Sequence, residues 1–282
     1  MSEREGRQQG RLLPHDKEWN RRHPQHDLLA SAVRSWYTSS APEMGYQTEE
    51  RPFGFYMRNV KLAGGSFNQV TLRDVSPGQV PELLADLRAY YGDGLIRILI
   101  DDRQTAERLR ATLLAAGCTH DTAQTYLAHA GPVPYADPVP GLATDAVGET
   151  NLVDYVVTKQ RGFAGTEEVP PSDVVANDVA LRRVELAGEG RFMLARMEGE
   201  PVGVIGWYEG EDRYIFLLAT RVPFRKRGIA RYLLCEALRD ADARGARSVI
   251  INADPDDTPV SLYRRLGFTD EVYWRDRYEL HG

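Results

Sequence analysis

The 282-residue chain is poor in cysteine and in long apolar stretches. Its two cysteines, Cys118 and Cys235, are too few for a disulfide framework, and no Cys/His cluster has the spacing of metal ligands. The sequence has no apolar run of about 18 residues and no secretory apolar segment at its start. We therefore expect a cytoplasmic protein with no metal and no membrane partner.

An excess of positive charge is also lacking. Lys and Arg number 35 against 41 Asp and Glu, which gives a net charge of −6. Such a chain has no general affinity for nucleic acid, so we expect no nucleic-acid partner, and any anion site must be a local cluster of cations. With 42% hydrophobic and 27% charged residues, the composition is that of an ordinary globular protein.

Composition divides the chain into four parts. Residues 1–26 have almost no apolar periodicity and indicate a polar tail. Four prolines in residues 131–141 are typical of a stiff linker. We therefore expect two domains, at 27–130 and 142–282, a number that fits a length of roughly 150 residues per domain.

The second domain alternates helix and strand patterns, which predicts a mixed α/β fold. Helices are expected over 151–162, over 173–186, from Gly228 onward, and from Thr258–Pro259 to a stop at Gly267. Strands are expected over 191–196, 202–208, 214–219, 249–252 and 272–280.

The first domain repeats this order of elements. Strands are expected over 54–62, 67–73, 95–100 and 122–127, with helices over 81–91 and 104–116. An offset of 150 residues aligns the two domains without a gap and superposes Gly78 on Gly228 and Gly117 on Gly267. Because both the helix-start and the helix-stop glycines keep this register, we interpret the domains as an internal repeat.

The most informative segment joins the strand 214–219 to the following helix. It contains Arg225-x-x-Gly228-x-Ala230, and small residues there allow a ligand to approach the backbone closely. The first N–H groups of the helix would form an anion site. Five cations and no acid lie within eleven residues: Arg221, Arg225, Lys226, Arg227 and Arg231. The segment therefore predicts a phosphate-binding turn.

Three features in fixed order resemble the GNAT superfamily of acyl-CoA-dependent N-acyltransferases. They are the turn Arg225-x-x-Gly228-x-Ala230, the strand 249–252, and Ser261-Leu-Tyr263-Arg-Arg-Leu-Gly267-Phe268, which is similar to the tyrosine helix of the family. The fold implied is two tandem GNAT-like domains, each a twisted, mixed and largely antiparallel sheet flanked by helices. One detail departs from the family pattern, because Val222 stands where a proline is frequent and Pro223 follows it.

The resemblance implies acetyl-CoA as cosubstrate. Its pyrophosphate would bind backbone N–H groups of residues 227–231, and its pantetheine arm would lie along the backbone near Leu218. Asn252 and Ser261 would contact the arm and Arg264 the nucleotide. The complete set of expected cosubstrate-binding residues is Leu218, Ala219, Thr220, Arg225, Lys226, Arg227, Gly228, Ile229, Ala230, Arg231, Asn252, Ser261 and Arg264.

Amide formation from a thioester needs a neutral amine, a polarised carbonyl and a proton for the departing thiolate. Tyr263, whose phenol is neutral at pH 7, suits the last role. A backbone N–H near Leu218 would stabilise the oxyanion. No general base is apparent, because the strand 214–219 has no carboxylate, and we interpret Glu209, Glu211 and Asp212 as a solvated acidic hairpin.

The first domain lacks the chemistry of the second. At the aligned positions it has Val75 for Arg225, Val80 for Ala230 and Leu113 for Tyr263, so we expect a degenerate copy with a packing role. The function expected is acetyl transfer to the primary amine of a small molecule, by a monomer or homodimer. Two alternatives stay open: decarboxylation of a malonyl-type CoA thioester, and a non-catalytic CoA-binding module.

Overall fold

We describe the protein from a computed structural model. The structure describes residues 11–12, 46–60, 68–210, 212–254 and 259–281, so the tail expected at 1–26 lies almost entirely outside the described residues. The chain divides into two compact units. We call unit 1 the described part of Leu127–Asn252 and 259–270, and unit 2 the described part of Tyr37–Tyr126 with 253–254 and 271–281. Each unit is described by itself.

Unit 2 is a sheet with two helices. Its elements are β2 (Tyr46–Arg51), β3 (Gly54–Asn59), β4 (Gln69–Leu72), the short 3-10 helix η1 (Pro77–Gln79), α4 (Val80–Tyr91), β5 (Leu95–Ile100), α5 (Arg103–Ala115) and the first part of β6 (Thr119–His129). The strands follow the order β2-β3-β4-β5 and then the end of β13. Only β4 and β5 run parallel among these pairs. Leu83, Leu87, Leu109 and Leu113 of the two helices are fully buried against the sheet.

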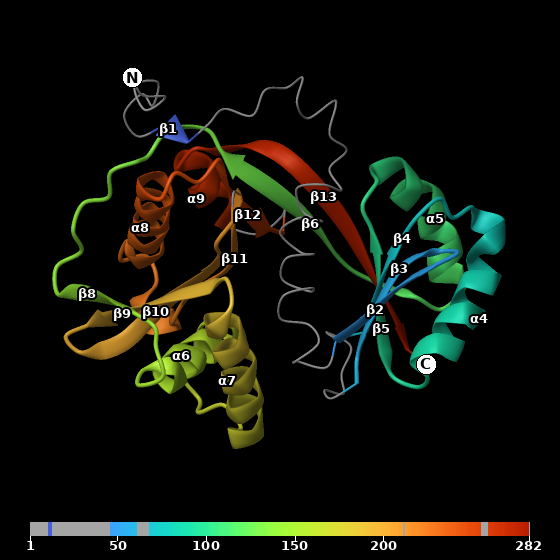
Figure 1. Ribbon diagram of the computed structural model, residues 1–282, viewed down its shortest axis with the longest axis horizontal. Helices are drawn as coiled ribbons and strands as arrows, with labels where there is room; N and C mark the ends of the chain where they lie inside the picture. Colours follow the sequence, from blue (N-terminus) through green and yellow to red (C-terminus); the bar gives the residue numbers. More distant parts are fainter. Residues whose placement is uncertain (1–10, 13–45, 61–67, 211, 255–258, 282) are drawn as a thin grey trace. The chain divides into compact units, whose positions relative to one another are not determined.

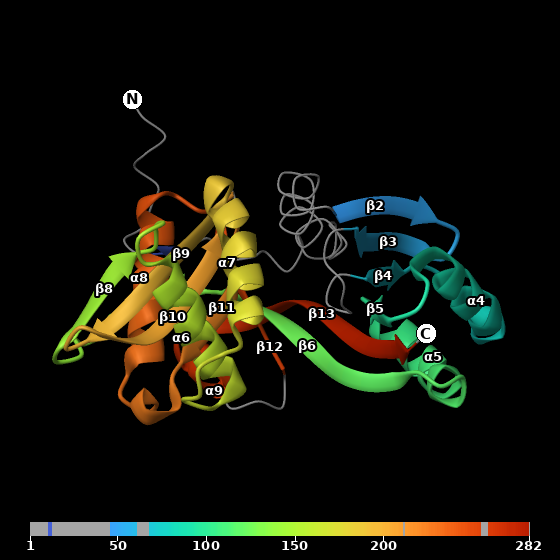
Figure 2. The ribbon, with the colours of Figure 1, turned by 90° about the horizontal axis from the view of Figure 1, so that it is seen from below.

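Unit 1 has helices on both faces of its sheet (Figures 1 and 2). Its elements are β8 (Leu142–Ala146), α6 (Leu152–Ala164), α7 (Ser172–Ala187), β9 (Gly190–Met197), β10 (Glu200–Tyr208), β11 (Asp212–Thr220), the 3-10 helix η2 (Val222–Phe224), α8 (Ile229–Ala243), β12 (Ser248–Ala253), α9 (Pro259–Arg265) and the start of β13 (Phe268–His281). A two-residue strand β7 (Gly131–Pro132) pairs with β1 (Arg11–Leu12). In strand order β12-β11-β10-β9-β8, only the β11–β12 pair is parallel.

Two long strands pass from one unit to the other. β6 begins in unit 2 and ends in unit 1, whereas β13 begins in unit 1 and ends in unit 2. The last strand of the chain therefore completes the sheet of the unit formed by the first half. The boundaries expected from composition differ from the units at this point, because composition reports linkers along the chain and not the pairing of distant strands.

The predicted fold class and the predicted elements are confirmed over the described residues. Every helix and strand expected between 81 and 280 is present, with ends that differ by a few residues. The strands β1, β2, β7 and β8 were not expected. The N-cap expected at Thr258 and the end of the strand expected at 54–62 lie outside the described residues.

Of the two aligned glycine pairs, one shares its backbone conformation and the other does not. Gly117 and Gly267 lie two residues beyond α5 and α9, and both have left-handed backbone, with φ of 90° and 94°. At the helix start the caps are Gln79, with φ −91°, and Gly228, with φ 86°. Gly78, which is aligned with Gly228, lies in η1 and is not among the glycines with positive φ, so this aligned pair does not share its backbone conformation.

Substituting Gly267 with Ala is expected to destabilise the protein by about 2–4 kcal/mol. A Cβ at this position would lie 2.8 Å from Nε2 of the buried His129 and 3.0 Å from the carbonyl oxygen of Ala130, and the φ of +94° adds strain. Urea unfolding measures the loss. Gly165→Ala is the control, since its φ is +67° and nothing lies within 4 Å of the added Cβ. Equal losses in the two variants would contradict the close packing at Gly267.

None of the helices formed by the described residues is long and apolar enough to cross a bilayer.

Candidate functional site

The parallel pair β11–β12 separates before β11 ends. Registered pairs run from Asp212 opposite Ser248 to Ile215 opposite Ile251, whereas β11 stays paired with β10 up to Thr220. Residues 216–220 of β11 therefore have one backbone edge that is not paired with β12. An open edge of this kind accepts an extended ligand through main-chain hydrogen bonds.

A β-bulge marks the point of separation. The register between β10 and β11 shifts from Gly206 opposite Leu217 to Trp207 opposite Ile215, which leaves Phe216 as the extra residue. A bulge bends the strand and leaves backbone groups out of the ladder. The expected oxyanion donor near Leu218 lies two residues beyond this bulge, on the open edge. Nothing in the sequence pattern had indicated the bulge.

The predicted phosphate turn comes directly after β11 in the chain. η2 occupies Val222–Phe224 with Pro223 in its first turn, so the displaced proline is accommodated. Lys226 and Gly228 both have left-handed backbone, with φ of 63° and 86°. No side chain caps the start of α8, and its first intrahelical bond runs from the N–H of Tyr232 to the carbonyl oxygen of Gly228. The N–H groups of residues 229–231 therefore precede the helical ladder and suit an anion.

One of the five cations near the turn, Arg221, is held by carboxylates. The Arg221 side chain is only 9% exposed and binds Glu167 through Nε, at 2.8 Å, and through its terminal nitrogen, while its other terminal nitrogen lies 2.8 Å from Glu200. These hydrogen bonds, above all the one that Arg221 donates to Glu167, raise the pKa of Arg221. A buried cation with two carboxylates is a structural ion pair.

Arg225 binds main-chain carbonyl oxygens on both sides of the turn. Its Nε donates to the carbonyl oxygen of Thr220 at 3.1 Å, and a terminal nitrogen donates to the carbonyl oxygen of Gly162 at 2.7 Å. These bonds join the turn to α6, while Arg225 itself is exposed, and its direct role in cosubstrate binding stays a prediction. The remaining cations, Lys226, Arg227 and Arg231, are exposed.

The proline-rich linker, residues 131–141, contacts side chains of α8. A terminal nitrogen of Arg231 donates to the carbonyl oxygen of Tyr135 at 3.0 Å, and the Tyr135 ring lies 5.6 Å from the Arg239 guanidinium carbon. Val139 reaches to within 3.5 Å of where a Cβ on Gly228 would lie. The stiff proline-rich segment therefore borders the predicted phosphate turn, an arrangement that composition alone did not indicate.

The tyrosine helix is α9. The Tyr263 side chain is nearly buried, with 6% of the residue exposed, and its ring meets that of Phe268 edge-on at 6.2 Å. Ser261 and Arg264 are exposed. At the end of β12, the Oδ1 of Asn252 accepts a hydrogen bond of 3.0 Å from the Tyr214 hydroxyl of β11. That bond lies where the two strands stop pairing, so Asn252 is close to the open edge, and its contact with the cosubstrate stays a prediction.

A network of buried charge lies between α6, α7 and the sheet. Asp178 accepts from Lys159, from Gln160 at 2.8 Å and from Arg182 at 3.1 Å. Arg182 also pairs with Glu185, which accepts a 2.6 Å bond from the Tyr208 hydroxyl. Burial lowers the pKa of Lys159 and raises that of Tyr208 well above its usual value. Each carboxylate is held by a cation, so the network fixes α7 against the sheet and supplies no ready base.

The interpretation of the β10–β11 turn as a solvated acidic hairpin is wrong for its described residues. Asp212 has an 8% exposed side chain and binds Arg247, with Nε at 3.0 Å, and the Ser248 hydroxyl at 2.6 Å. Glu209 pairs with Arg191 at 3.1 Å and lies 3.6 Å from the buried Arg213. Glu211 lies outside the described residues. Arg191, Arg213 and Arg247 neutralise this turn, and two of them, Arg191 and Arg247, are distant from it in the sequence, so local patterns do not reveal the pairing.

Neither cysteine suits a covalent acyl intermediate. Both thiols are free and buried, and burial raises the pKa of Cys118 and of Cys235. A buried thiol with a raised pKa is a weak nucleophile at neutral pH.

The equivalent region of unit 2 lacks an open edge. β4 pairs with β5 up to Thr71, one residue before β4 ends at Leu72. Val75, Val80 and Leu113, at the positions aligned with Arg225, Ala230 and Tyr263, are buried in the core. These features support the interpretation of the first domain as a copy with a packing role.

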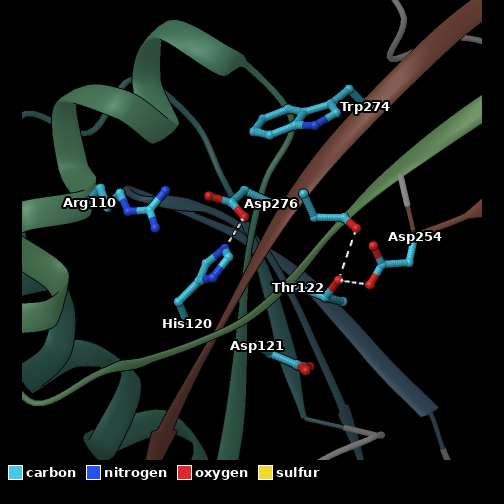
Figure 3. A pocket seen from close by; sticks show the side chains of 8 residues that line it. Arg110, His120, Asp121, Thr122, Asp254, Trp274 and Asp276 are labelled. Atoms are coloured by element: carbon cyan, nitrogen blue, oxygen red, sulfur yellow. Dashed lines mark hydrogen bonds and ion pairs between the residues drawn. The ribbon is translucent and has the colours of Figure 1, made fainter. Parts of the chain in front are cut away.

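Unit 2 has a polar pocket of about 450 Å³ elsewhere (Figure 3). It is lined by Arg110, His120, Asp121, Thr122, Ala123, Asp254, Trp274 and Asp276. His120 Nε2 lies 2.6 Å from Asp276, and the Thr122 hydroxyl donates to Asp254 at 2.5 Å. The lining comes from α5, β6, β13 and the segment after β12, and includes none of the residues aligned with the phosphate turn. We assign it no part in acyl transfer.

Comparison with known proteins agrees with this geometry. Residues 154–275 match the family model of the GNAT acetyltransferase domain. Residues 154–275 therefore form a GNAT acetyltransferase domain. The match includes α6 to α9 and much of β13, and therefore the open edge, the turn and the tyrosine helix. The family predicted from the turn and the tyrosine helix is confirmed.

Solved structures show the GNAT fold over most of the chain. A GCN5-related N-acetyltransferase from Kribbella flavida has a TM-score of 0.60 at 15% identity, covering 90% of this chain and 96% of that one. A tandem GNAT protein from the clavulanic acid biosynthesis pathway has a TM-score of 0.55 at 12% identity, covering 91% and 96%. A protein of unknown function from Staphylococcus epidermidis has a TM-score of 0.63 at 12% identity, covering 85% and 95%. At these identities the likeness shows the fold alone.

Proposed function

We propose that the protein is an acetyl-CoA-dependent N-acetyltransferase that acts on a primary amine of a small molecule. The observation that carries the proposal is the open edge of residues 216–220, followed at once by the uncapped N-terminus of α8. The edge suits an extended chain of amide groups, and the helix start suits the diphosphate attached to it. Pantetheine linked to a nucleotide diphosphate has both features in this order.

The donor set fits this cosubstrate. N–H groups of residues 229–231 and the exposed Lys226, Arg227 and Arg231 offer donors and positive charge for a diphosphate on a chain of net −6. The bound thioester would supply the acetyl group. Ser261, Arg264 and Asn252 would contact the remainder of the cosubstrate.

In the proposed reaction the neutral amine attacks the thioester carbonyl and forms the amide bond, while the carbon–sulfur bond breaks. A backbone N–H near Leu218, beyond the bulge at Phe216, would hold the developing oxyanion. Tyr263 would donate its proton to the departing thiolate and regain one from the amine nitrogen through solvent. The amine would enter beside α6, α7 and the aromatic side chains of β10 and β11, as a small-molecule partner of a monomer or homodimer.

A screen of amines tests the proposal. Purified protein is incubated with acetyl-CoA and a library of small primary amines, and products are read by mass spectrometry together with free thiol. Acetylated product with stoichiometric thiol is expected. Incubation with malonyl-CoA tests the alternative decarboxylation, since carbon dioxide without acyl-amine would replace our proposal. Binding of CoA with no turnover of any thioester would instead indicate a non-catalytic module.

A further inference from the structure

Arg221 connects the phosphate turn to the loop between α6 and α7. It follows the last residue of β11, and two of its nitrogens bind one oxygen of Glu167, which lies in the connection between Ala164 and Ser172. The Arg221 guanidinium also packs 5.2 Å from the Phe224 ring. The Arg221 side chain is 9% exposed and that of Glu167 is 35% exposed, so water screens this pair in part.

Arg225 forms a second connection between the same parts. It joins the carbonyl oxygen of Thr220 to that of Gly162 in the last turn of α6. Gly162 is packed so closely on β11 that a Cβ there would lie 2.9 Å from the Cβ of Ala219. The start and the middle of the turn are thus both held to residues 162–167.

The turn itself is not in a relaxed conformation. Lys226 is a non-glycine residue with φ of 63°, and it lies directly after Arg225. Left-handed backbone at such a residue costs about 1–2 kcal/mol, so surrounding contacts must maintain it. On the side of the α6–α7 loop, Arg221 and Arg225 supply such contacts.

We propose that Arg221 and Arg225 are positioning residues that couple the phosphate turn to the α6–α7 loop, so that diphosphate binding at the turn and ordering of residues 163–169 favour each other. This rests on the proposed function, in which the turn binds the diphosphate of CoA. An anion bound to the N–H groups of residues 229–231 also restricts residues 226–228, which join these groups to Arg225, and through the two arginines it restricts Gly162 and Glu167. Coupling between two sites is reciprocal, so an ordered loop also tightens binding at the turn.

The consequence for the reaction is an order of events. The α6–α7 loop borders the side where we place the amine, so cosubstrate binding would prepare that side before the amine arrives. Arg221 is paired with two glutamates, and comparing them distinguishes the coupling from the effect of neutralising a buried charge. Glu167 is in the loop, whereas Glu200 is in β10, and each lies 2.8 Å from a nitrogen of the same guanidinium.

Hydrogen exchange with CoA as probe tests the coupling. In the unsubstituted protein, saturating CoA is expected to slow exchange of the amides in residues 163–169 at least about fivefold. In Glu167→Ala the slowing of exchange by CoA is expected to fall below about twofold. The Kd for CoA is expected to rise by the same factor as this slowing decreases. If the Arg221–Glu167 contact contributed to stability alone, Glu167→Ala would leave both the slowing of exchange by CoA and the Kd for CoA unchanged.

Glu200→Ala is the matched control, because it removes a carboxylate from the same arginine without touching the loop. It is expected to retain the slowing by CoA. Equal slowing in all three proteins, or a loop whose exchange does not respond to CoA that binds, would overturn the coupling and leave the proposed function intact. Absence of CoA binding to the unsubstituted protein would overturn the proposed function itself.

Discussion

Gly228→Val is expected to weaken CoA binding by at least about 100-fold while the protein stays folded. Gly228 has φ of +86°, a backbone that a β-branched residue does not adopt, so the start of α8 must rearrange. Two or three hydrogen bonds to a charged diphosphate would be lost, each of about 1.5–3 kcal/mol. Isothermal titration of CoA measures the change. The fold tolerates the added carbon, since the nearest heavy atom, on Val139, lies 3.5 Å from the new Cβ.

Gly199→Val separates loss of the turn from general backbone strain. Gly199 has φ of +88° in the exposed turn between β9 and β10, and nothing lies within 4 Å of an added Cβ. Both variants should lose about 1–2 kcal/mol of stability in urea unfolding. Only Gly228→Val should lose CoA. Unchanged CoA affinity in Gly228→Val would show that the diphosphate binds elsewhere.

Tyr263→Phe is expected to lower kcat about 100-fold and to change the Kd for CoA less than about threefold. The substitution removes the proton donor for the thiolate, and positioned proton transfer contributes about 10²–10⁴-fold to a rate. The ring keeps its place beside Phe268, so packing is preserved. Steady-state turnover of the amine found in the screen measures kcat, and titration measures affinity.

Tyr155→Phe is the comparison for Tyr263→Phe. The Tyr155 side chain is fully buried in the core of unit 1, packed 4.9 Å from the Phe192 ring, and its hydroxyl is outside the proposed chemistry. Its kcat should stay near that of the unsubstituted protein. If Tyr263→Phe also keeps full turnover, the phenol of Tyr263 has a structural role and another group protonates the thiolate.

Local patterns sufficed for the elements and for the turn. The apolar spacing of Leu233, Leu234 and Leu238 buries one face of α8, and all three are fully buried. Gly228 and Gly267 stand where the backbone is left-handed, which few other residues allow. Such features depend on neighbours along the chain and are therefore visible in the sequence. The family followed from them.

The roles of charged side chains could not be obtained in this way. Arg221 and Lys226 are equally cationic in the sequence, yet Arg221 is buried between Glu167 and Glu200 and Lys226 is exposed. The local sequence predicts that Asp212 is solvated, yet its carboxylate is bound by Arg247. A charge acquires its role from its partners in space, and these partners lie 21 to 54 positions away.

By itself the sequence determined a mixed α/β chain with a glycine turn that opens a helix, because backbone conformation and apolar periodicity are local properties. Only the tertiary structure decided which edge of β11 stays open, which arginines remain available to an anion, and that β13 ends in the sheet of the first half. Strand pairing and ion pairing join residues far apart in the chain, and the order of residues alone does not specify where such distant partners meet.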